Sequence, residues 1–474
     1  MPMRSSIRSE ELSPFQPHSQ IISPTIIYFQ DKYIQTNAKK SILEVSSEDI
    51  TDGNLFRSML ILAVPLVVQN VVQVLQQVID IVFLGRLSGD AVAAVGLATP
   101  LLGLLFAGVF VTFVGTQIVV SRRVGATNQA GARTAQATGI VMALAVGVIF
   151  SGLMALMAGP LLRLLSMVRS ESGLAVTELA IQYLSVLALC GNVVLDPLLI
   201  FGLGPFPQLG ITGAALATAL GSLAGMLLAI GLISRGRNDS MLTLACLGID
   251  RETINKILSV GAPVGGQQAA RQLLRLPIYL LVFLAAGGAG LAAYTIGARV
   301  ASIAFVPPQG LQQAAQSVVG QNLGAERPDR ARRTVWLGVT VASGALLVVG
   351  LGQWIAAGPL AIGFAPTLSS EGFSLTVEYL QILAIGYPTL GAIYLFEAGF
   401  NGADRSRISF VSTLLQYGAV RLPIAAIGVL FLGGSVTSVF WAVTISNAAT
   451  ALWLAWYYDA VGDGLMGRAA AVAQ

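Results

Sequence analysis

Long apolar segments separated by short polar loops occupy most of the chain. A transmembrane helix needs about 20 apolar residues, and lipid offers no partner for the backbone groups of an open strand. We therefore predict helices throughout and an all-α polytopic membrane protein. The eleven apolar segments are 57–85, 91–120, 135–158, 179–203, 211–233, 260–286, 291–319, 334–364, 376–400, 408–432 and 435–459.

The second half of the chain repeats the first with a period near 198 residues. Three pairs of short segments match: Ala63–Pro65 with Gly261–Pro263, Val124–Ala126 with Leu323–Ala325, and Tyr183–Leu189 with Tyr379–Ile385. The repeat predicts two homologous six-helix bundles, an N-terminal bundle over 55–240 and a C-terminal bundle over 241–460. Two related bundles that rock about a central site are a common transporter design.

The match breaks near Cys190 and Gly191. The second half continues for about 32 residues from Ile385 to the segment that starts at Tyr417, whereas the first half reaches Asn192 almost at once after Leu189. About 29 residues are thus absent from the first half by this comparison. We predict that it lacks part of helices four and five, so that eleven to twelve segments cross or enter the membrane.

The arginine clusters conflict with an odd number of spans. They stand at 122, 123 and 133; at 235 and 237; at 327, 330, 332 and 333; and at 405 and 407. Basic loops favour the cytosolic side, and twelve spans would place all four clusters there, whereas eleven would put the last three outside. Segment 179–203 dips in and returns to the same face, or the second half is inverted, or the protein is damaged. We prefer the first interpretation.

Composition narrows the class of protein. Only 11% of the 474 residues are charged and 55% are apolar, whereas soluble domains carry about 25% charged residues. The single histidine, His18, lies in the polar N-terminal stretch, so proton chemistry inside the membrane would have to use carboxylates. No phosphate-binding loop with its lysine is present, which argues against an ATP-driven pump. We expect no enzyme activity, no cofactor and no nucleic-acid partner.

The first 54 residues differ from the rest of the chain. They hold three of the four lysines, seven acids and few long apolar runs. We interpret 1–54 as a polar, disordered N-terminal extension, with an organelle-targeting segment as the alternative. Residues 461–474 form a short tail.

Five motifs carry a family resemblance. Asp80–Leu97 resembles the junction of the first and second helices in the multidrug and toxic compound extrusion (MATE) family, and the remaining four fit later places in that pattern: Asn192–Gly202, Gly213–Thr218, Gly320–Ala325 and Val420–Pro423. The resemblance covers about 57–460 and is closer to the DinF-like branch. It implies a substrate cavity and cation-coupling residues in the N-terminal bundle. In this sequence these are Asp80, Asn192, Asp196 and Thr218.

The first apolar segment carries a polar stripe. Gln69, Gln73, Gln76, Gln77 and Asp80 fall within an arc of roughly 100° on a helix. Amides and a carboxylate are expensive in hydrocarbon, so such a stripe favours the wall of a wet cavity. A helix–helix seam with glutamine hydrogen bonds is the structural alternative.

The candidate cation-coupling residues of the first half would lie at one depth in the membrane in a twelve-span topology. Asp80, Asp196 and Thr218 then sit roughly 10 Å below the outer face, and Asn192 lies one turn from Asp196. Two carboxylates in one desolvated pocket cannot both ionise cheaply, which predicts a proton or Na⁺ site. The alternative is that each acid extends to the nearby interface.

The second half has no comparable acid pair. Glu397 stands three residues from the expected end of its helix, so we expect it to snorkel to the interface. Arg271 and Arg275 are one turn apart in mid-helix and share a face with Gln267 and Gln268. They act either as structural counter-ions or water contacts, or as ligands for anionic groups.

Arg421 is also in mid-helix, with Tyr417 one turn before it. A further glutamine stripe comprises Gln309, Gln312, Gln313 and Gln316. We assign the substrate cavity to Gln69, Gln73, Gln76, Gln77, Arg271, Arg275, Gln312, Gln316 and Arg421.

These observations predict a secondary active antiporter that exports small organic compounds in exchange for H⁺ or Na⁺. Na⁺ at Asp80 and Asp196 is the one metal site considered. The alternatives are a lipid-linked flippase of the same superfamily, a defective non-transporting paralogue, and an organic-acid exporter that the three arginines would suit. We expect a monomer among membrane lipids in the plasma (inner) membrane, with an organelle membrane as the alternative.

Overall fold

The computed structural model describes five parts of the chain. These are 47–71 and 89–149, with short gaps at 69, 144 and 147–148, followed by 250–364, 369–431 and 435–471. Every element within them is helical, which confirms the predicted all-α class. Segment 179–203 and the stretch predicted to be shortened near Cys190 lie outside the described residues.

The short helix α2 (Ser47–Asp52) lies within the stretch 1–54, so the expectation of disorder is wrong for these six residues. The described part of the N-terminal bundle contains an apolar helix over Leu55–Val68 and the long helix α4 (Gly89–Gly125). At 1.5 Å per residue, α4 is about 55 Å long, more than the thickness of a hydrocarbon core. Its last turn carries Arg122 and Arg123, and cations stabilise the C-terminal end of a helix dipole.

Helix α9 (Arg251–Ala304) contains a reversal of the chain. Asp250 caps its first turn by accepting hydrogen bonds from the backbone N–H groups of Glu252 and Thr253. The helical geometry fails at Ala286 and Gly287, where Gly287 has a φ of 56°. The rings of Tyr279 and Tyr294 lie 5.1 Å apart, although a straight helix would separate them by about 22 Å. The element is therefore two antiparallel spans, as the sequence pattern predicted.

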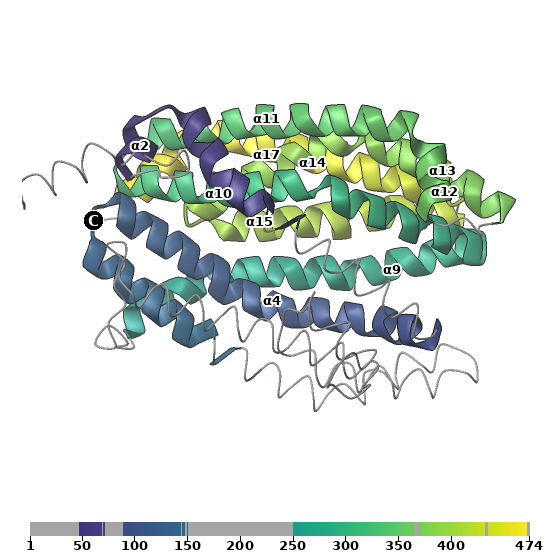
Figure 1. Ribbon diagram of the computed structural model, residues 1–474, viewed down its shortest axis with the longest axis horizontal. Coiled ribbons are helices and arrows are strands. Elements are labelled where there is room, and N and C mark those ends of the chain that lie inside the picture. Colours follow the sequence, from purple (N-terminus) through teal and green to yellow (C-terminus); the bar gives the residue numbers. More distant parts are fainter. Residues whose placement is uncertain are drawn as a thin grey trace, which may run out of the picture. The chain divides into compact units, whose positions relative to one another are not determined.

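The rest of the C-terminal bundle follows α9 along the chain and is drawn from teal to yellow in Figure 1. The chain continues through α10 (Val306–Gly324), α11 (Pro328–Ile355), α12 (Ala357–Phe364), α13 (Ser370–Ile385), α14 (Tyr387–Gly402), α15 (Ser406–Thr413), η2 (Leu414–Arg421), α16 (Leu422–Ala426), η3 (Ile427–Phe431) and α17 (Thr437–Ala471). Helices α13 and α14 meet at an angle of 49°, and together they are long and apolar enough for one span.

The π-helical segment η2 has a local cause. Pro423 lacks a backbone N–H, and its ring clashes with the carbonyl four residues earlier, which disfavours a regular α-helix there. The backbone N–H of Leu422 instead donates to the carbonyl of Tyr417, five residues back. The wider turn holds Tyr417 and Arg421, and such π segments are frequent at functional sites.

Basic loops from both halves meet at one end of the described helices. A guanidinium nitrogen of Arg122 lies 3.6 Å from a carboxylate oxygen of Asp404. A guanidinium nitrogen of Arg123 donates to the Thr253 hydroxyl at 2.9 Å. The loop after α4, the start of α9 and the loop after α14 are therefore on the same side. An inverted second half is excluded for these loops, whereas the path of segment 179–203 stays a prediction.

The two bundles touch each other closely near that basic end. A Cβ added to Gly125 would lie 2.0 Å from the carbonyl oxygen of Gln321, and one added to Gly324 would lie 2.1 Å from that of Arg122. Since each glycine and each carbonyl has its counterpart 199 residues away, the contact is nearly two-fold symmetric. The described helices α4 and α10 therefore touch at this end, and only glycine permits the approach.

Apolar side chains cover the outer faces of the second bundle. Val348, Leu351 and Ile355 of α11 are exposed, as are Leu452 and Trp456 of α17. Large exposed apolar surfaces on a helical bundle indicate contact with lipid. The protein is therefore an integral membrane protein.

Candidate substrate-binding site

A polar cavity of about 130 Å³ lies inside the second bundle. It is formed by side chains of α9, α10, α14 and η2, and the π-helical turn contributes two of them. The lining residues are Gln268, Arg271, Gln272, Arg275, Gln309, Leu390, Ile393, Tyr394, Gln416 and Tyr417. Among these ten there are two arginines and no carboxylate.

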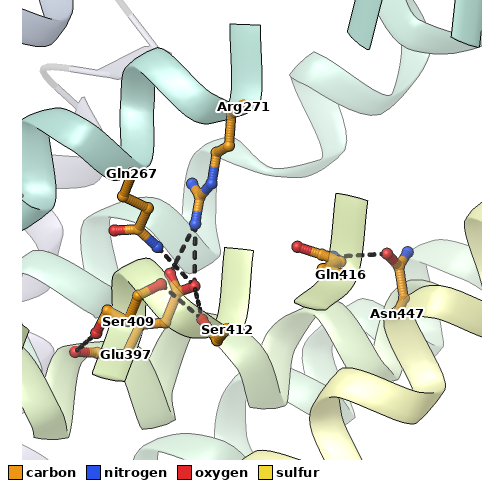
Figure 2. A network of polar contacts seen from close by, with 7 residues as sticks. All are labelled: Gln267, Arg271, Glu397, Ser409, Ser412, Gln416 and Asn447. Atoms are coloured by element: carbon orange, nitrogen blue, oxygen red, sulfur yellow. Dashed lines mark hydrogen bonds and ion pairs between the residues drawn. The ribbon is translucent and has the colours of Figure 1, made fainter. Parts of the chain in front are cut away.

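Next to the cavity, Glu397 is the centre of a buried polar network (Figure 2). One guanidinium nitrogen of Arg271 donates to both carboxylate oxygens, at 3.0 and 2.8 Å. The Gln267 amide donates to the same carboxylate at 2.7 Å, and the Ser412 hydroxyl donates at 3.1 Å. Glu397 is only 1% exposed, so the expectation that it snorkels to the interface is wrong. Its partners come from two other helices, which position along its own helix does not reveal.

A second network holds Arg421, which is 5% exposed. Its guanidinium donates to the Ser446 hydroxyl at 2.9 Å and to the Asn447 side-chain oxygen at 2.7 Å. The Gln416 amide also donates to this oxygen, at 2.7 Å (Figure 2). All these partners are neutral, so the network satisfies the donors of Arg421 without cancelling its charge.

Tyr417 lies between two of the arginines. The guanidinium carbon of Arg421 is 4.1 Å from the centre of its ring, a cation–π distance, and that of Arg275 is 6.0 Å away. Arg275 is exposed and lines the cavity. Among the ion pairs of the described residues, none involves Arg275.

The structure separates the predicted cavity residues into groups. Arg271 and Arg275 line the cavity, and Arg421 packs behind it on Tyr417. Gln316, which is 4% exposed, instead donates from its amide to the Gln117 side-chain oxygen at 3.0 Å and joins the two bundles. Gln312 lies on α10 and is half-buried.

The predicted residues of the first half cannot be placed. Gln69, Gln73, Gln76, Gln77, Asp80, Asn192, Asp196 and Thr218 lie outside the described residues, so their roles stay predictions. The described residues contain no group of three or more His, Cys, Asp or Glu side chains that could hold a metal ion.

Sequence reasoning did not single out several residues around the cavity. Gln272 and Tyr394 line it, and Asn447 orients both Gln416 and Arg421. Gln272 could have been identified from the sequence, because it lies next to Arg271 in a polar run. Asn447 gives none, because a lone amide in an apolar helix does not indicate which helix it faces.

Comparison with known proteins identifies the family. The MatE family model matches residues 65–200 and 263–427, which together make up well over half of the chain. The chain belongs to the MatE family. The predicted MATE membership is thereby confirmed, and assignment to the DinF-like branch stays a prediction. One matched range lies in each half of the chain.

Curated relatives in the MatE family are transporters. The chain is 27% identical over 432 residues to a protein of Pseudomonas aeruginosa named "Probable multidrug resistance protein NorM", covering 84% of this chain and 88% of that one. It is 32% identical over 251 residues to a protein of Shewanella oneidensis named "FAD transporter", a match that spans 50% of this chain and 52% of that one. The predicted class of efflux transporter is confirmed.

Solved structures support the MatE fold. A MOP superfamily transporter from Pyrococcus furiosus superposes with a TM-score of 0.81 at 23% identity, covering 89% of this chain and 99% of that one. An outward-facing multidrug resistance MATE family transporter superposes with a TM-score of 0.79, also at 23% identity and with coverage of 89% and 100%. At this identity the likeness concerns the fold alone.

Proposed function

We propose that this MatE chain exports small organic compounds by alternating access, in exchange for H⁺ or Na⁺. The observation that supports this most is the glycine contact between α4 and α10 at the basic end. Basic loops favour the cytosol, so the contact closes the cytosolic side. A carrier that is closed on one side must open there at another stage of its cycle, and this contact is where it would separate.

Cation binding would drive that separation from the first bundle. Asp80 and Asp196, with Asn192 and Thr218, are the residues that we propose for the coupling site, because intramembrane acids are functional by default. Binding of H⁺ or Na⁺ in this bundle and of substrate between the bundles would favour different states. We further propose that the transporter works as a monomer among lipids of the plasma membrane.

The test measures ethidium transport in everted membrane vesicles under an imposed H⁺ or Na⁺ gradient. Asp80→Asn should abolish gradient-driven uptake, because the variant can neither release a proton nor hold a cation. Asp90→Asn is the matched control, since Asp90 lies in the first turn of α4 and outside the proposed coupling site. Normal coupled transport by Asp80→Asn would overturn the coupling site.

Two further outcomes would decide against the proposal itself. Proteoliposomes that move no ethidium or other organic dye under either gradient would indicate a non-transporting paralogue. Movement of labelled lipid between leaflets without dye transport would indicate a flippase.

A further inference from the structure

We propose that the polar cavity of the second bundle binds one anionic group, a carboxylate or phosphate, of the compound that the protein transports, with Arg275 as its principal ligand. This rests on the proposed export function and names the class of substrate. It concerns a site in the C-terminal bundle, separate from the acids proposed for cation coupling.

The charges around the cavity do not balance. Three guanidinium groups, those of Arg271, Arg275 and Arg421, lie in or behind its wall, and the one described carboxylate among their partners belongs to Glu397. Glu397 is bound by Arg271, which leaves the charges of Arg275 and Arg421 without a described acid. A site that holds two uncompensated cations in a bundle interior favours an anion.

Arg275 is the arginine whose donors are available to a ligand. Arg271 is bound to Glu397, and Arg421 is buried against Ser446 and Asn447. Arg275 is exposed and lines the cavity, where its guanidinium interacts with the Tyr417 side chain and has no described acid as a partner. A guanidinium offers a planar fork of donors that matches carboxylate and phosphate oxygens.

The rest of the lining suits the same group. The amides of Gln268, Gln272, Gln309 and Gln416 line the cavity and can each donate a hydrogen bond. Gln416 is oriented by Asn447, and Arg421 is held on the face of Tyr417 at 4.1 Å. The Gln416 donor is therefore already oriented, which lowers the entropy cost of binding at this position.

The size of the cavity limits what enters it. Pockets for whole drug-sized ligands measure about 300–1,000 Å³, whereas this cavity measures about 130 Å³. It accommodates a carboxylate or phosphate with a few waters, and the remainder of the compound would extend out of it. The cavity is therefore a subsite that selects for charge.

The test uses two fluorescent probes that differ by one charge, dansylglycine with a carboxylate and its neutral amide. Binding to the full-length protein is measured in nanodiscs of phosphatidylcholine. The wild-type protein should bind dansylglycine about tenfold more tightly than the amide, and Arg275→Gln should remove this preference. Arg275→Lys should retain part of it, because it keeps the charge but not the fork. Arg333→Gln, which removes an exposed arginine at the start of α11, should leave the preference intact.

Several results would overturn the proposal. These are equal affinity of the wild-type protein for the two probes, an unchanged preference in Arg275→Gln, and an equal loss of both probes in that variant, which would indicate a purely structural role. If Arg275→Gln does not fold, the affinities of the wild-type protein for dansylglycine and for its amide decide the question by themselves. Displacement of dansylglycine by added phosphatidylglycerol would assign the site to a lipid headgroup instead. Ethidium transport without any dansylglycine preference would leave the export function standing while this inference fails.

Discussion

Arg271 and Arg275 lie one turn apart on the same face of α9, yet their surroundings differ completely. Arg271 donates to Glu397 within a buried network of neutral and charged partners. Arg275 faces an aromatic ring and a polar cavity. The spacing of two like residues thus does not determine their role. What decides it is whether a neighbouring helix brings a carboxylate to one and not to the other.

The largest effect is expected from a variant that removes the counter-ion of Arg271, so that Arg271, like Arg275, has no carboxylate partner. Glu397→Gln leaves the Arg271 charge buried without its counter-ion, which should cost about 3–5 kcal/mol in the free energy of unfolding. Thermal unfolding in detergent measures the loss, and Glu371→Gln, at an exposed acid in the first turn of α13, is the control. The double variant Arg271→Met with Glu397→Leu should recover much of the stability. If Glu397→Gln is as stable as the control, the pair does not hold the bundle together.

A smaller loss of stability is expected when the aromatic ring of Tyr417, beside Arg275, is removed. Tyr417→Leu removes the aromatic face on which Arg421 packs, and a desolvated cation–π contact contributes about 2 kcal/mol. Tyr417→Phe keeps the ring and should keep most of that stability. Chemical unfolding of the three proteins gives the comparison. Equal losses in both variants would point to the hydroxyl rather than to the ring.

The arginines can act in transport only if the bundles close and open. Gly324→Ala places a methyl group against the carbonyl of Arg122, so the closed state should be disfavoured and the transport rate should fall about tenfold, equivalent to 1.4 kcal/mol. Gly344→Ala, with nothing within 4 Å of the added atom, is the matched control. Equal rates in both variants would show that this contact does not limit the cycle.

The smallest effect concerns an exposed ion pair, which contrasts with the buried one at Arg271. A hydrogen bond from Arg327 lowers the pKa of Asp52 below its ordinary value. Because the folded pKa is depressed, this contact is present above about pH 4 and is lost as the pH falls through the folded pKa. Hydrogen exchange in α2 should therefore rise in acid, and Asp52→Asn should abolish that dependence. An identical acid response in the variant would assign it to another group.

Much of the fold follows from the sequence, and the site follows less well. The apolar segments and the repeat predicted the helices, and a polar face on α9 predicted the arginines of the cavity. The partner of Arg271 was missed, because Glu397 comes from a helix 126 residues later and only packing brings the two together. The bend at Gly386 and the π-helical turn before Pro423 were not predicted either.

The contact between α4 and α10 is isologous in form. Gly125 meets Gln321 while Gly324 meets Arg122, and Gln117 meets its own counterpart Gln316, so residues that are equivalent in the two halves lie about a common axis. A homodimer of half-length chains would form this same joint. When the two halves are linked in one polypeptide, this interface is preserved, but the sequences of the halves can diverge from each other. Acids could then accumulate in one half and arginines in the other, an asymmetry that no symmetric dimer could have acquired.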